Sequence, residues 1–151
     1  MKTLVLGIGN PILSDDGAGI RVAREVEKQL KDPQVIVAET SAAGLRLLDS
    51  IIGYDEVIII DAIQTGEGNA GQIYRMEPKD FSFTKRFSSP HQINLVTALE
   101  LGKMLNLAMP QEISIFAVEA KDITSFSEKC TPEVEQAIPK VVKMVLDELV
   151  G

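Results

Sequence analysis

Short, continuous runs of apolar residues alternate along the chain with longer segments in which apolar residues recur every three or four positions. Residues 4–8 form one such run, which ends at a turn sequence, Gly-Asn-Pro, at residues 9–11. Residues 57–60 are four consecutive β-branched residues, the pattern of a strand buried on both faces. Similar runs predict further strands at residues 35–38, 72–76 and 113–118.

The segments with three- and four-residue spacing predict helices. They lie at residues 16–30, 47–52, 95–105 and 131–149. The last helix has a clear start, with Thr131 as N-cap and Pro132 at the first helical position.

The order of these elements predicts the fold class. Strands that alternate with helices pair in parallel and place helices on both faces of the sheet. A glycine-rich loop, Gly66–Gly71, leads to the strand at residues 72–76 without a helix, which favours an antiparallel or edge strand. We therefore predict an α/β protein, a single three-layer α/β/α domain over residues 1–151, with a mostly parallel sheet of about five strands and one antiparallel strand.

Composition narrows the functional classes. With 22 acidic and 15 basic residues the net charge is −7, which argues against a nucleic-acid partner, because such binding relies on Lys and Arg to neutralise phosphates. No apolar run is long enough to span a membrane, and no signal peptide is evident, so we expect a cytoplasmic protein. Nothing in the sequence predicts an obligate oligomer.

The single Cys and single His exclude a cysteine-based metal site and multi-histidine motifs within one chain.

Acidic residues follow two of the predicted strands. Asp15 and Asp16 lie shortly after the first strand, and Asp61 directly follows the strand at residues 57–60. Ligands of open α/β sheets bind beyond the carboxyl ends of the strands, so this edge is a candidate site. Taken alone, helix capping is the better explanation of Asp15 and Asp16, whereas a structural hydrogen bond and a functional role account equally well for Asp61.

The only histidine, His91, precedes the third helical stripe by four residues and continues its inward face. It could pack against the core or ligate a metal as a neutral imidazole. Together, Asp16, Asp61 and His91 would suit nickel, zinc, manganese or cadmium, provided that the fold brings them together.

Two other motifs are weaker candidates. Gly7 and Gly9 begin like a dinucleotide-binding fingerprint, but Ile12 stands where the third glycine is required. Cys130 could pair with His91 as a nucleophile, although a structural thiol is the simpler interpretation.

Several blocks, taken in order, give the chain a resemblance to a known family. Residues 4–10 with 15–19, the pair Asp61-Ala62, residues 89–92 and the final helix from Thr131 through Pro139 resemble the hydrogenase maturation endopeptidases. These proteases trim the C-terminal extension of the large subunit of [NiFe] hydrogenases. The resemblance covers essentially the whole chain.

The resemblance implies specific roles. Asp16, Asp61 and His91 would be the metal-binding residues that sense nickel already inserted in the [NiFe] hydrogenase large-subunit precursor, and zinc or cadmium could occupy the same site. As a hypothesis for the chemistry, Asp16 and Asp61 are the candidate catalytic residues, with one of them orienting a metal-polarised water. The alternatives are a metal-binding maturation chaperone that does not cleave the precursor and a nucleotide-binding α/β domain.

Overall fold

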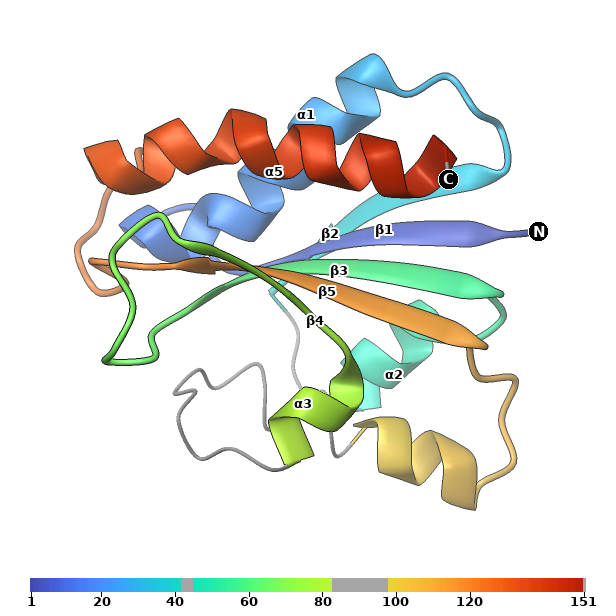
Figure 1. Ribbon diagram of the computed structural model, residues 1–151. Helices are drawn as coiled ribbons and strands as arrows, with labels where there is room; N and C mark the ends of the chain where they lie inside the picture. Colours follow the sequence, from blue (N-terminus) through green and yellow to red (C-terminus); the bar gives the residue numbers. More distant parts are fainter. Residues whose placement is uncertain (42–44, 83–97, 151) are drawn as a thin grey trace.

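The computed structural model describes residues 1–41, 45–82 and 98–150, and its centre is a five-stranded sheet (Figure 1). The strands are β1 (Thr3–Ile8), β2 (Val35–Thr40), β3 (Glu56–Ile63), β4 (Ile73–Met76) and β5 (Glu112–Glu119). Their order is β2-β1-β3-β5-β4, and every pairing is parallel except that of β4 with β5. The predicted mixed sheet, with its antiparallel edge strand, is confirmed.

Helices cover both faces of the sheet. They are a 3₁₀ turn, η1 (Ser14–Gly17), and the α-helices α1 (Ala18–Gln29), α2 (Leu45–Ile51), α3 (Pro78–Ser82) and α5 (Pro132–Val150), with a further helical segment at residues 98–104. The helices α1 and α5 pack side by side on one face, while α2 lies on the other (Figure 1).

Two hydrophobic clusters separate these layers. One contains Val22 of α1 and Val141 of α5 with Ile58 and Ile60 of β3. The other contains Ile51 of α2 and the alternate β3 residues, such as Ile59. Because β3 contributes side chains to both clusters, it is buried on both faces, as its unbroken β-branched run predicts.

The boundaries differ from the predicted ones at two places that matter for the site. The first helix begins as η1, and α1 itself starts only at Ala18. Strand β3 continues to Ile63, so Asp61 lies within the strand and not after it. The reason is that β5 extends alongside to Glu119, whereas the ladder between β1 and β3 ends at Gly7 and Ile60.

Within residues 1–41, 45–82 and 98–150, every helix is too short or too polar to span a bilayer.

Candidate active site at the carboxyl edge of the sheet

Asp61 lies at the carboxyl edge of the sheet, one residue past the end of the β1–β3 ladder. It pairs in register with Ala117 of β5, and only 4% of its surface is exposed. Ile59 and Ile63 belong to the core cluster on the α2 side, so by strand alternation Asp61 projects to that side as well. Its Oδ1 accepts a hydrogen bond from the backbone N–H of Ala62 at 2.8 Å.

Asp16 is carried by η1, directly before α1. Its Oδ2 accepts a hydrogen bond from the backbone N–H of Asn10 at 3.0 Å, and its side chain is only half-buried. The turn at Gly9 makes this arrangement possible. Gly9 has φ of +149°, and a Cβ there would lie 1.9 Å from the carbonyl oxygen of Asp16, so only glycine allows the two backbone segments to cross.

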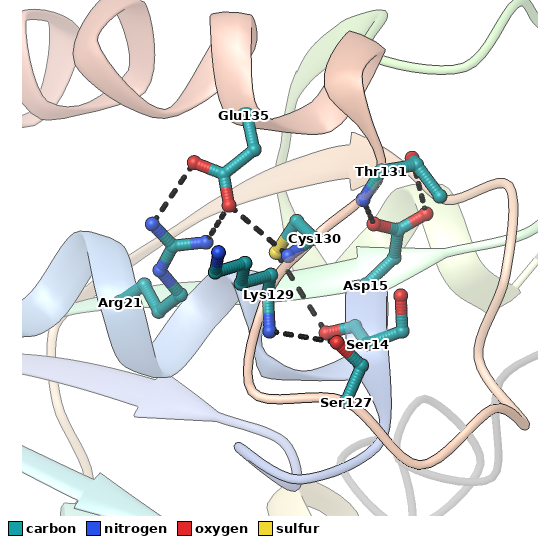
Figure 2. Close-up of polar contacts among 8 residues, drawn as sticks. All are labelled: Ser14, Asp15, Arg21, Ser127, Lys129, Cys130, Thr131 and Glu135. Carbon is teal, nitrogen blue, oxygen red and sulfur yellow. Dashed lines mark hydrogen bonds and ion pairs between the residues drawn. The ribbon is translucent and has the colours of Figure 1, made fainter.

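Asp15 has a different role from its neighbour. It is fully buried, and Oδ2 accepts hydrogen bonds from the backbone N–H groups of Lys121 and Asp122 at 2.9 and 3.0 Å. The backbone N–H of Thr131 donates to Oδ1 and its hydroxyl to Oδ2, at 2.7 and 2.8 Å (Figure 2). Asp15 therefore joins η1 to the loop between β5 and α5, and it does not cap α1, where no side-chain capping bond is present.

The fold brings the segments that carry Asp16 and Asp61 together. The turn η1 contacts β3, and Gly19 at the start of α1 packs so tightly that an added Cβ would lie 2.3 Å from the carbonyl oxygen of Ile60. Both predicted carboxylates therefore belong to one edge of the sheet. The third predicted residue, His91, lies outside the described residues. Within the part of the chain that the structure describes, no three His, Cys, Asp or Glu side chains form a metal-sized group.

Glu119 is a buried acid at this edge that the sequence analysis did not single out. It is 3% exposed, and its carboxylate accepts hydrogen bonds from the backbone N–H and the hydroxyl of Thr65 and from the hydroxyl of Tyr74. Burial and the neighbouring Glu119 raise the pKa of Tyr74. Glu119 follows the apolar run of its strand, as Asp61 follows the apolar run of β3, so the same reasoning could have found it. Its hydrogen bonds fasten the glycine-rich loop after β3 to β5.

Cys130 is built into the support of η1. Its thiol donates a weak hydrogen bond to the carbonyl oxygen of Ser14 (3.7 Å), and its backbone N–H donates to Glu135 (3.0 Å). Glu135 in turn forms a two-pronged ion pair with Arg21 of α1, which lowers the pKa of Glu135 (Figure 2). Burial raises the pKa of the Cys130 thiol, which disfavours the reactive thiolate. These contacts support a structural role.

Gly7, the first glycine of the incomplete nucleotide fingerprint, packs against the backbone of Gly19 in α1. A Cβ on Gly7 would lie 2.4 Å from the carbonyl oxygen of Gly19, and one on Gly19 would lie 2.6 Å from that of Ile8. Helix α1 thus rests directly on the end of β1. This close approach accounts for Gly7 without a phosphate ligand.

Comparisons with known proteins agree with this architecture. Residues 20–148 match the family described as hydrogenase maturation protease (HycI). The chain is 30% identical over 152 residues to the hydrogenase 2 maturation protease of Escherichia coli K12, covering 99% of this chain and 91% of that protein.

Solved structures give the same result. The hydrogenase maturating endopeptidase HybD from E. coli superposes with a TM-score of 0.82 at 27% identity, covering 99% of this chain and 92% of that one. The [NiFe] hydrogenase maturation protease HybD from Thermococcus kodakarensis, at 24% identity, shares the fold with a TM-score of 0.76 over 97% of this chain and 98% of that one.

Proposed function

The chain belongs to the hydrogenase maturation proteases, and from this premise we propose that it removes the C-terminal extension of a [NiFe] hydrogenase large-subunit precursor after nickel insertion. One structural observation links the proposed function to particular residues. Asp16 and Asp61 are 45 positions apart in sequence (61 − 16), yet contacts of η1 and Gly19 with β3 bring their segments to the same edge of the sheet. Such an edge is where α/β folds bind ligands.

The donor set fits a divalent metal ion. Asp16 and Asp61 offer carboxylate oxygens, and His91 would add one imidazole nitrogen, a combination that suits nickel, zinc or cadmium. The metal recognised in the reaction is nickel held by the precursor, so these three residues would complete its coordination when the precursor docks. Cysteine thiolates for nickel would come from the precursor, because the buried Cys130 of this chain is engaged elsewhere.

The hydrolytic step needs a group that takes a proton from the attacking water. When bound, the metal would supply Lewis acidity to the reacting groups. Asp61, held by Ala62 and almost shielded from solvent, is suited to orient a water, and the half-buried Asp16 is suited to accept its proton. The same geometry also allows the two carboxylates to exchange these roles.

A cleavage assay tests the function. Purified precursor, with or without nickel, is incubated with the protein, and its intact mass is measured over time. We expect loss of a C-terminal peptide from the nickel-loaded precursor only. Equal cleavage of both forms would contradict nickel sensing. Stable binding of the precursor without any loss of mass would instead identify a maturation chaperone.

Metal binding is tested separately by titrating Ni²⁺ or Cd²⁺ into the protein in a calorimeter. Asp16→Asn, Asp61→Asn and His91→Ala should each weaken binding by about tenfold or more, since each removes a ligand. Glu112→Gln is the matched control, because Glu112 is an exposed acid at the opposite end of β5. Equal loss of binding in the control would reject the assigned ligands.

A further inference from the structure

Two apolar side chains are exposed next to η1, the 3₁₀ turn that carries Asp16. Phe126 is 85% exposed and Ile12 is 48% exposed. They stand on neighbouring backbone segments, because Ser127 donates a hydrogen bond to the carbonyl oxygen of Ile12 at 2.9 Å. We call these two residues the Ile12–Phe126 pair.

The backbone on both sides of Phe126 is fixed by hydrogen bonds. The carbonyl oxygen of Ser127 accepts from the N–H of Ser14 at 2.9 Å. The carboxylate of Asp122 accepts from the N–H groups of Thr124 and Ser125 at 3.0 and 2.9 Å, which closes the preceding turn. The exposure of Phe126 is therefore a property of an ordered loop.

Core packing does not explain Phe126. Ile123, in the same loop, packs against the hydrophobic cluster under α1 and α5, whereas Phe126 leaves most of its ring in water. A single exposed apolar residue needs no explanation, but an aromatic side chain paired with a second apolar residue beside a candidate site is typical of a recognition contact.

The position of the Ile12–Phe126 pair indicates that its partner is a protein. Ile12 lies four residues before Asp16, and Asp15 ties this segment to the loop that contains Phe126. A protein-sized partner bound at Asp16 would therefore lie within reach of the pair. A free metal ion or a small ligand would not reach it.

We propose that the Ile12–Phe126 pair is a substrate-recognition contact, which binds an apolar surface of the precursor next to its scissile segment. This inference rests on the proposed protease function. Because the pair lies outside the reacting groups, it contributes binding that is equal in the ground state and the transition state. Such binding changes KM and leaves kcat nearly constant.

The test is steady-state cleavage of nickel-loaded precursor by Phe126→Ser and Ile12→Ser. We expect KM to rise about tenfold for Phe126→Ser, a typical loss for an aromatic interface residue, with kcat within about twofold of wild type. Phe126→Leu should restore most of the affinity, because leucine retains an apolar surface. Met104→Ser is the control, because Met104 is 80% exposed and lies in the helical segment that leads to the opposite edge.

The outcomes separate this inference from the function on which it rests. If wild type does not cleave the precursor, the proposed function fails. The pair is then judged by precursor affinity, which must fall in Phe126→Ser. If wild type cleaves and Phe126→Ser has an unchanged KM, the recognition contact alone is rejected. Ultracentrifugation that shows a wild-type dimer dissociated by Phe126→Ser would also overturn it, since the pair would then bind a second copy.

Discussion

The two edges of the sheet are both acidic, but they are built differently. At the carboxyl edge, Asp15, Asp61 and Glu119 are each at most 4% exposed and accept hydrogen bonds from backbone N–H groups or hydroxyls. At the amino edge, Glu56 and Glu112 face each other in register on β3 and β5, closer to solvent.

The difference shows that acidity alone does not mark a site. The acids of the amino edge repel one another: burial, together with the charges of Glu112 and Glu148, raises the pKa of Glu56. Arg75 pairs with Glu148 and relieves part of this repulsion. At the carboxyl edge each acid has its own fixed donors, so a carboxylate can be held at a defined position.

Asp15→Ala should have the largest effect on stability, and it tests the contrast between the two edges of the sheet most strongly. It removes the shared acceptor of the backbone N–H groups of Lys121, Asp122 and Thr131, so we expect a loss of about 3–5 kcal/mol in the free energy of unfolding. Urea unfolding measures this. Asp16→Asn is the control and should lose less than about 1 kcal/mol, because that side chain is half-buried. Similar losses in both variants would refute the division of roles between the two acids.

Gly9→Ala should destabilise the protein by about 2–3 kcal/mol, because the new methyl would collide with the carbonyl oxygen of Asp16 in a backbone conformation unsuited to alanine. Thermal and urea unfolding report the change. Gly66→Ala is a matched control: Gly66 also has a positive φ, of +77°, but no atom lies within 4 Å of its added Cβ. Its cost should be near 1 kcal/mol, from strain alone. Equal losses of stability in the two variants would show that the backbone at Gly9 is not in close contact with the carbonyl oxygen of Asp16.

Glu119→Gln should lose about 1–2 kcal/mol, because the amide provides only one acceptor oxygen for the donors from Thr65 and Tyr74. The same urea experiment with Glu128→Gln, an exposed acid, should show a change below about 0.5 kcal/mol. A loss in Glu119→Gln no greater than in this control would mean that the buried carboxylate does not fasten the glycine-rich loop.

Glu56→Gln should have the smallest effect and the opposite sign. The pKa of Glu56 is raised in the folded protein, so its protonation favours folding. This contribution is fully present below the unfolded pKa of about 4.3 and is lost as pH rises through the folded pKa. At pH 7 the variant should therefore be more stable than wild type by about 0.5 kcal/mol after solvent screening, and the gain should vanish near pH 3. A gain independent of pH would exclude a charge effect.

The sequence was sufficient to predict the sheet, because strand and helix periodicities are local properties of the chain. The antiparallel edge strand could be predicted for the same reason, from the short loop before β4. The extent of β3 could not, because it depends on how far β5 extends beside it. The apolar pattern alone would end β3 before Asp61, but Asp61 lies inside the strand.

The site was predicted only in part. The sequence could not distinguish Asp15 from Asp16, because the donors that hold Asp15 come from residues more than 100 positions away, such as Lys121 at a separation of 106. The requirement for glycine at positions 7 and 9 likewise comes from tertiary contacts, which the sequence does not reveal. The placement of Asp16 and Asp61 at one edge agrees with the prediction, and the contribution of His91 stays a prediction.

The most direct test of the central claim is the cleavage rate of nickel-loaded precursor by Asp16→Asn and Asp61→Asn, beside Glu112→Gln from the amino edge. Intact-mass measurement over time gives the rates, and thermal unfolding confirms that each variant is folded. We predict that both carboxyl-edge variants are slower by about 10²-fold or more, while Glu112→Gln cleaves at the wild-type rate. Full activity in both aspartate variants would contradict the account.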